Sequence, residues 1–185
     1  MLLSFAQWIQ ATAFFTALRA SAYVYPIVLA LHMTGIALFG GMVLMTDMRL
    51  LGWAMRTHSI SDVVTTFRVP KRWGLLLVAT CGALMLGAKA EEYYYNAFLR
   101  TKLILLALVA LHALVFYRSV YANPAVLDQL PRVPATAKLA AALSVVLWVS
   151  IACCGRGIGY IEPPLDKIHA QTHFMKEIAD AAHPN

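Results

Sequence analysis

Long stretches without charged residues divide the chain into four apolar parts. The longest runs from Ala20 to Thr46 and is bounded by Arg19 and Asp47. As a helix it would extend about 40 Å, more than the roughly 30 Å of a bilayer's hydrocarbon core. Three shorter charge-free stretches follow, at 73–88, 103–117 and 139–155. The pattern therefore predicts an all-α, polytopic membrane protein that forms a four-transmembrane-helix bundle.

The three shorter stretches need their flanking residues to complete a span. Basic side chains at a span's end can reach back to the membrane surface, and tyrosines favour the interface. These flanks are Arg72, Lys89, Lys102, Arg118, Lys138, Arg156, Tyr93, Tyr94, Tyr95, Tyr117, Tyr121 and Tyr160. With them, we expect a bundle over residues 20–160. Its spans are predicted at about 20–46, 73–90, 100–120 and 137–156.

The two ends of the chain differ from the spans. In residues 1–19 the apolar positions suit an amphipathic helix at the membrane surface. Arg19 follows this segment, whereas a secretory signal has its basic residues first. A fifth, very short span is the alternative there. Residues 161–185 are predicted to form an extramembrane C-terminal tail.

Composition and charge agree with a membrane protein. Of the 185 residues, 61% are hydrophobic and 13% are charged, whereas a soluble domain has about 25% charged residues. The net charge is +6, and the connections 47–72 and 118–138 carry eight basic and three acidic residues. The opposite side carries seven basic and six acidic residues. This bias predicts a bacterial inner-membrane protein with both termini in the periplasm and leaves almost no excess charge for a nucleic-acid partner.

Two histidines lie inside predicted spans. His32 is close to the middle of the first span and His112 to the middle of the third. The two spans run in the same direction, so the rings should differ in depth by only about 4–5 Å. Paired neutral imidazoles can hold a b-type haem at both axial positions, and Gly35 would make room for it. A structural hydrogen bond from each histidine to a neighbouring helix is the alternative.

Basic residues at the outer ends of two spans extend the haem hypothesis. Lys89 follows the second span and Arg156 ends the fourth. Their charges can bind an anion such as a haem propionate or a lipid phosphate. The alternative is that both only anchor their spans at the interface.

A second metal hypothesis rests on sulfur. Met42, Met45 and Met48 recur at every third position, and Met33 follows His32. Thioethers prefer Cu(I), so copper is the alternative cofactor or cargo. Methionine is also a common filler of irregular apolar gaps, and packing is the competing interpretation of this pattern.

The predicted tail carries two histidines that stand four residues apart on one helical face. His169 and His173 have a spacing that can share a metal ion, but two ligands are too few for a structural site. A solvated helix face is the competing interpretation. The tail and the outer face are also a candidate surface for a protein partner.

Several strings resemble an uncharacterised family of small bacterial four-span inner-membrane proteins. They include Tyr25-Pro26, His32, Gly35, Asp47-Met48-Arg49-Leu50-Leu51-Gly52, Phe98-Leu99-Arg100-Thr101-Lys102 and Gly155-Arg156-Gly157-Ile158-Gly159-Tyr160. The resemblance covers nearly the whole chain before the tail and implies no activity. In size and span count the chain is also distantly similar to copper-resistance permeases and cytochrome b561-like proteins.

Three functions remain open from the sequence, and whether the protein is an enzyme is uncertain. The first is a membrane redox subunit that holds haem b between His32 and His112. It would pass electrons between a periplasmic partner and the quinone pool. The second is a non-catalytic subunit that anchors or stabilises a larger complex. The third is a permease for copper or another small solute, which would use the face of His32, Met42 and Met45.

Overall fold

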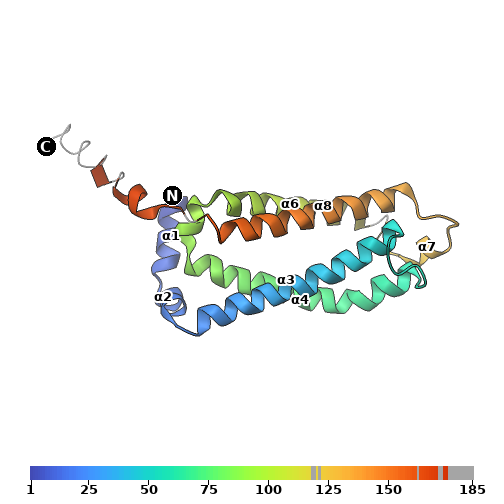
Figure 1. The fold of residues 1–185 in the computed structure, drawn as a ribbon, viewed down its shortest axis with the longest axis horizontal. Coiled ribbons are helices and arrows are strands. Elements are labelled where there is room, and N and C mark those ends of the chain that lie inside the picture. The colour runs from blue at the N-terminus through green and yellow to red at the C-terminus, as the bar shows by residue number, and fades with distance from the viewer. Residues whose placement is uncertain (118–119, 121, 162, 171–172, 175–185) are drawn as a thin grey trace.

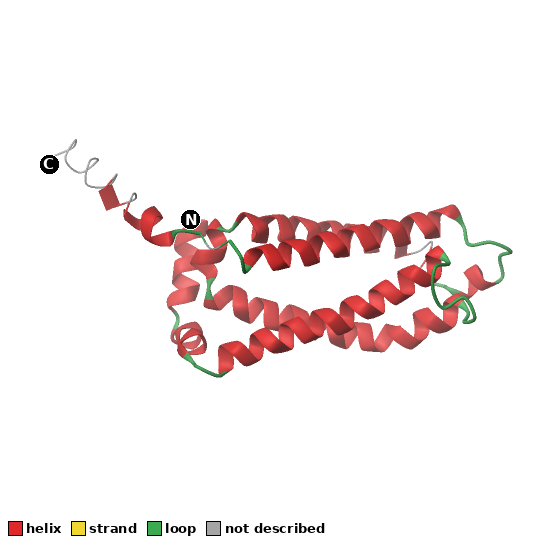
Figure 2. Ribbon diagram, in the orientation of Figure 1, coloured by secondary structure: helices red, strands yellow, loops and turns green. Residues whose placement is uncertain are grey.

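The protein is built from helices. The computed structural model describes residues 1–117, 120, 122–161, 163–170 and 173–174, and these described residues contain no strand (Figure 2). Four helices are long and apolar enough to cross a membrane, as the sequence predicts. They are α3 (Val24–Leu51), α4 (Ile60–Ala88), α6 (Ala97–Phe116) and α8 (Ala135–Ile158). The four-span prediction is therefore confirmed.

The four long helices form two antiparallel pairs. α3 packs along α4, and α6 packs along α8 (Figure 1). The two pairs meet mainly where α3 crosses α8. α3 and α6 run in the same direction (Figure 1), as the up-and-down topology requires. We call the end of the bundle that carries the N-terminus the terminal end (Figure 1).

The helices differ in length from the predicted spans. α4 begins at Ile60, thirteen residues before the predicted start at 73, and it contains Pro70. The prediction starts this span directly after Arg72, whereas Arg68, Lys71 and Arg72 are all part of the helix. Its start is set by Ser59, whose hydroxyl accepts a hydrogen bond of 3.0 Å from the Asp62 amide, a common N-capping arrangement.

A carboxylate from a distant segment completes the start of α4. Asp128 ends the short helix α7 (Ala125–Asp128) and accepts hydrogen bonds from the amides of Ile60 (2.6 Å) and Ser61 (3.0 Å). Partial burial of the Asp128 carboxyl raises its pKa. The hydrogen bonds from Ser61 and Ile60 have the larger combined effect, so the pKa of Asp128 is lowered overall. The carboxylate thereby ties the two loops at this end of the bundle together.

Replacing Asp128 with Ala should lower the stability of the protein by about 1 kcal/mol, the usual effect of losing a helix cap. Because the folded-state pKa of Asp128 is depressed, this contribution is present above the ordinary carboxyl pKa. It is lost as the pH falls below about 4. Unfolding in detergent at pH 7 and at pH 3 measures both effects. An unchanged midpoint at pH 7 would contradict the assigned role.

The N-terminal segment forms two short helices instead of the single one predicted. α1 (Leu2–Ala11) and α2 (Ala13–Ala20) are separated by Thr12, whose backbone is extended and whose hydroxyl bonds the carbonyl of Ile9. They lie across the terminal end of the bundle (Figure 1). Phe15 of α2 packs so closely on Gly87 that an added Cβ there would lie 2.3 Å from the ring. Their location at a membrane surface remains a prediction.

The best-packed core lies at the opposite end, which we call the loop end. Leu50 of α3 is completely buried there, and Ala137, Ala140 and Ala141 of α8 are buried beside it. Small residues let the helix backbones approach closely, which is how helices commonly pack within membranes. The cluster also includes Ile60, Val64, Val120 and Leu127. This core fixes α3 against α8 and so positions the polar residues one turn away.

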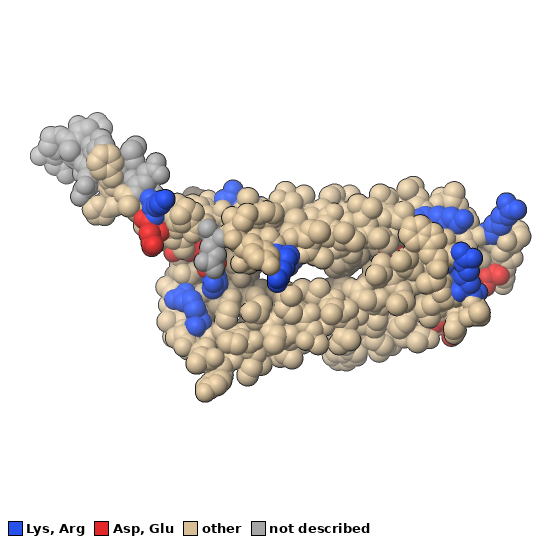
Figure 3. All heavy atoms as spheres, in the orientation of Figure 1, with Lys and Arg blue, Asp and Glu red and all other residues tan. Residues whose placement is uncertain are grey.

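The surface separates charged from apolar regions as expected for a chain that crosses a bilayer. On the face shown in Figure 3, acidic and basic side chains gather at the two ends of the bundle, and the band between them is almost entirely uncharged. An opening between the two helix pairs is visible near the centre, with a basic side chain beside it (Figure 3).

Candidate functional site

All four spanning helices contribute side chains to one cavity, which we call the polar pocket. Its volume is about 170 Å³, room for a few water molecules or one small solute. α3 contributes Val43, Thr46 and Asp47, α4 contributes Lys71, α6 contributes Val109, His112 and Ala113, and α8 contributes Ser144 and Trp148. The pocket therefore combines an acid, a base, an imidazole and two hydroxyl groups within an otherwise apolar bundle.

Asp47 is the most constrained polar group of the pocket. Its side chain is 2% exposed, and Ser144 of α8 donates a hydrogen bond to it. The other carboxyl oxygen, Oδ2, is buried without a hydrogen-bond partner. A buried carboxylate oxygen without a partner is costly. Uptake of a proton or of a polar solute from the pocket would remove that cost.

Lys71 faces Asp47 from the neighbouring helix. Its ammonium donates a hydrogen bond of 3.1 Å to the hydroxyl of Thr46, which in turn bonds the carbonyl of Met42. The charges of Lys71 and Asp47 interact, yet the two side chains are not within 4.0 Å as a direct ion pair. Solute or water can therefore lie between the two charges.

His112 brings an imidazole from the other helix pair. Its Nε2 atom is 2.8 Å from the carbonyl oxygen of Ala140 in α8, and its ring is tilted against Phe116 at 5.0 Å. The hydrogen bond to α8 matches the structural alternative considered from the sequence. Because the ring also lines the pocket, it adds an imidazole to the polar groups there.

Two aromatic rings pack together on the terminal side of the pocket. Phe39 of α3 is 7% exposed and packs edge-to-face on Trp148 of α8, with ring centroids 5.2 Å apart. Phe39 also presses on Gly74 of α4, where an added Cβ would lie 3.1 Å from the Phe39 Cβ. Phe39 precedes Val43 by one turn. This aromatic pair therefore joins α3 to α8 at the terminal side of the polar pocket, and we call it the aromatic barrier.

His32 lies on the terminal side of this barrier. The residue is 9% exposed, and its Nδ1 atom is buried without a hydrogen-bond partner. The ring lies against α4, where it approaches the backbone of Val78 and would lie 3.1 Å from a Cβ added at Gly82. Gly82 thus makes room for the histidine.

The two predicted haem ligands face different helices. Counted from helix ends at the terminal end, His32 is eight residues into α3 and His112 fifteen residues into α6, or about 12 and 22 Å along their helices. This offset exceeds the predicted one because the span midpoints do not mark the true helix ends. The space beside Gly35 is filled by the side chains of Val78 and Leu77 of α4. Haem ligation by this pair stays a prediction that requires both rings to move.

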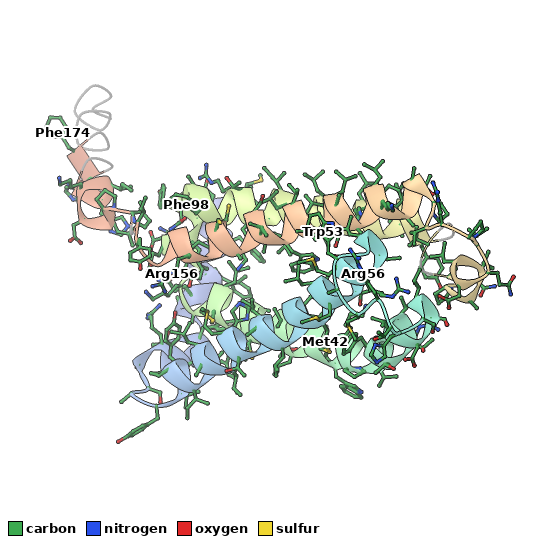
Figure 4. The ribbon with its side chains drawn as sticks, turned by 45° about the vertical axis from the view of Figure 1, so that its right-hand side comes forward. Met42, Trp53, Arg56, Phe98, Arg156 and Phe174 are labelled. Carbon is green, nitrogen blue, oxygen red and sulfur yellow. The ribbon has the colours of Figure 1, made fainter. Side chains whose placement is uncertain are left out.

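The predicted outer cations already have protein partners. Lys89 forms a 3.0 Å ion pair with Glu92. Arg156 donates a hydrogen bond of 2.6 Å to the hydroxyl of Tyr160 and lies over its ring. Figure 4 shows Arg156 and Phe98 at the terminal end of the bundle. Anion binding by Lys89 and Arg156 is not tested by these contacts.

The methionines of the copper hypothesis do not line the polar pocket. Met33 and Met45 are about half exposed on the outside of α3, and Met42 (labelled in Figure 4) contributes only its backbone carbonyl to the network beside the pocket. Within the described part of the chain, no three His, Cys, Asp or Glu side chains are arranged to hold a metal ion. The polar pocket consists of hard oxygen and nitrogen groups.

The described part of the tail docks on the terminal end of the bundle. His169 Nε2 is 2.9 Å from Oε1 of Glu91 in α5 (Ala90–Tyr95). The same Oε1 atom accepts a hydrogen bond of 2.8 Å from the side-chain amide of Gln7 in α1. The Gln7 hydrogen bond is the main cause of the lowered pKa of Glu91, and the His169 hydrogen bond adds to it. His173 is helical, whereas the later tail positions of the predicted helix lie outside the described residues.

Replacing Glu91 with Ala should release the tail from the bundle, because α1 and the tail both bond that carboxylate. The protection of residues 163–170 against hydrogen exchange, expressed relative to the intrinsic rate at each pH, is expected to fall in this variant and, in the wild type, once acid protonates the carboxylate. Glu92→Ala is the matched control, since it removes only the ion pair with Lys89. Equal exchange in both variants would contradict the docking role.

Sequence reasoning missed most of the pocket. Asp47 and Lys71 were assigned to connections between spans because they interrupt apolar runs, and Ser144 gave no signal among the small residues of its span. One signal was present: Asp47 follows a 27-residue charge-free run. An acid that ends so long an apolar run can belong to the same helix and face the bundle interior.

The fold and the pocket define a four-span membrane protein with a polar site between two helix pairs. Residues 5–161 match the family model DUF6644, described as a family of unknown function. The chain therefore belongs to the DUF6644 family, in agreement with the resemblance to an uncharacterised family. No curated protein and no solved structure matches the chain, so the distant likeness to copper-resistance permeases and cytochrome b561-like proteins has no support.

Proposed function

We propose that this protein is a small permease that carries protons, together with a small solute, through the polar pocket. The observation that carries this proposal is the unpartnered Oδ2 of Asp47, which lies in a cavity lined by all four spans. Ionisable side chains at membrane depth commonly mark proton or ion pathways. The charge bias of the loops supports the bacterial inner membrane as its location, with both termini in the periplasm.

The other groups of the pocket suit proton transfer. His112 supplies an imidazole, a side chain that commonly shuttles protons, and the hydroxyls of Ser144 and Thr46 can relay protons through hydrogen bonds. Lys71 offsets the charge of ionised Asp47 without a direct ion pair, so Asp47 can take up a proton without breaking a salt bridge. The cavity of about 170 Å³ is smaller than the sites of drug-sized ligands, which restricts the solute to a small molecule.

Proton movement in proteoliposomes tests the proposal. Vesicles that contain a pH-sensitive dye are given a pH gradient in potassium chloride, phosphate and succinate, and valinomycin holds the membrane potential at zero. The wild-type protein should collapse the gradient several times faster than protein-free vesicles do. Equal rates would overturn the proposal.

The redox function remains a second proposal, favoured by the free Nδ1 atom of His32. An unprotonated imidazole nitrogen is the atom that ligates haem iron. A haem b subunit would pass electrons between a periplasmic partner and quinone. The protein purified in detergent should then show a Soret band and a reduced α-band that disappear in His32→Ala. A colourless preparation without iron would contradict this second proposal.

A further inference from the structure

A second polar cluster lies on the terminal side of the aromatic barrier, and the mechanism above does not use it. We call it the outer cluster, and it consists of His32 of α3, Lys102 of α6 and Cys154 of α8. The Nζ atom of Lys102 would lie 3.5 Å from a Cβ added at Gly155. Its charge interacts with Cys154 and with His32. The cluster therefore draws residues from both helix pairs, His32 from one pair and Lys102 and Cys154 from the other.

Lys102 does not behave as the interfacial flank that the sequence suggests. It is the sixth residue of α6, about 8 Å along the helix from Ala97, and its side chain is half-buried. Within the described part of the chain, no carboxylate lies within 4.0 Å of its ammonium group. A partly buried cation at this depth is costly without a counter-charge.

His32 supplies an independent sign that this cluster is incomplete. The residue is more than nine-tenths buried, and its Nδ1 atom has no partner, although buried polar atoms are nearly always hydrogen-bonded. Lys102 therefore lacks an anionic partner, and His32 lacks a hydrogen-bonding partner for its Nδ1 atom. One carboxylate would supply both, because it can accept from the ammonium and from a protonated imidazole.

We propose that the outer cluster binds the carboxylate of a small organic acid. This inference rests on the proposed transport function and gives it a substrate class. A cation beside the route opposes the entry of a lone positive charge, so a proton that passes this way travels with an anion. The carboxylate would pass the Phe39–Trp148 barrier and meet Lys71 in the polar pocket, while Asp47 holds the proton.

Cys154 is a natural reporter for this site. With Cys81 and Cys153 replaced by Ala, Cys154 is the only thiol, and its modification can be timed with the sulfonate reagent MTSES and the cationic reagent MTSET. Both form the same type of mixed disulfide and release a sulfinate. If the cluster attracts anions, MTSES should react faster than MTSET, relative to their rates with a free thiol. Lys102→Gln should reduce that preference roughly tenfold.

Three controls keep the result interpretable. Lys102→Arg should retain the preference, which separates loss of charge from loss of fold. Arg100→Gln removes a positive charge from an exposed position of the same helix and should change nothing. With Cys153 as the only thiol, on the exposed neighbouring position, the preference should not depend on Lys102.

Protection experiments identify the source of the carboxylate. Succinate should slow the modification of Cys154 if the ligand comes from water, and laurate should do so if it comes from the membrane. Either result supports the carboxylate site, provided that Lys102→Gln removes it. A preference for MTSES that survives Lys102→Gln, or no protection by either acid, would overturn the inference. Neither result depends on the proton assay, so the two proposals can fail separately.

Discussion

Replacing Phe39 with Ala should increase the rate at which the protein collapses a pH gradient. The ring packs on Trp148 at the terminal side of the polar pocket, and an apolar constriction blocks the passage of ions by excluding water. An edge-to-face aromatic pair contributes about 0.5–1.5 kcal/mol, so loss of the pair should raise the rate about two- to tenfold. The proteoliposome assay measures this change.

The control for this variant removes a phenyl ring from a position that is distant from the aromatic barrier. Phe14 of α2 is 60% exposed, and Phe14→Ala should leave the rate unchanged. Phe39→Leu, which preserves an apolar side chain against Gly74, should raise the rate less than Phe39→Ala does. A rate in Phe39→Ala that equals or falls below the wild-type rate, with the protein still folded, would contradict the barrier.

Replacing Leu50 with Ala should cause the largest loss of stability of any substitution proposed for this protein. Leu50 is completely buried against Ala137, Ala140 and Ala141, so the change leaves a cavity that these small side chains cannot fill. Buried Leu→Ala substitutions cost about 2–5 kcal/mol. The unfolding midpoint in detergent should fall accordingly, and the α3–α8 crossing should loosen.

A neighbouring position provides the comparison for Leu50. Leu44 lies on the same helix and is 40% exposed, where it would contact lipid. Leu44→Ala leaves no internal cavity and should cost much less than Leu50→Ala. Equal losses in the two variants would indicate that the loop-end core does not hold the helix pairs together.

The sequence predicted the number and order of the spans because apolar length alone determines what can cross a bilayer. Ala20 to Thr46 exceeds the required length, and the shorter runs were completed by their basic and aromatic flanks. The helix bounds were less predictable. The polar start of α4 continues the helix beyond the apolar run, and its beginning depends on Asp128, which is distant in the sequence.

The candidate site could not be derived from the sequence because it depends on how the helices pair and rotate. The midpoint positions of His32 and His112 suggested a shared ligand, yet each ring turns to the partner within its own pair, α4 for His32 and α8 for His112. The charge pattern predicts an interfacial flank at Lys102, whereas its ammonium lies against α8, 3.5 Å from a Cβ added at Gly155. The pattern of charges along the chain indicates how deep a side chain lies in the membrane, but not which face of its helix the side chain occupies.

The transport proposal and the redox proposal predict different roles for the same residues. In the transport proposal Asp47 takes up the proton and His32 helps to bind the anion. In the redox proposal His32 is essential and Asp47 only supports the fold. An absorption spectrum and a proton assay on the same preparation therefore separate the two without any assumption about the partner protein or the solute.

The most direct test of the central claim compares Asp47→Asn with Asp62→Asn in the proteoliposome assay. Both variants remove one carboxylate, but Asp62 is exposed at the start of α4, whereas Asp47 is buried in the polar pocket with an unpartnered oxygen. Asp47→Asn should reduce gradient collapse to the rate of protein-free vesicles, and Asp62→Asn should retain the wild-type rate. A folded Asp47→Asn protein that collapses the gradient as fast as the wild type would contradict the claim that the pocket carries the proton.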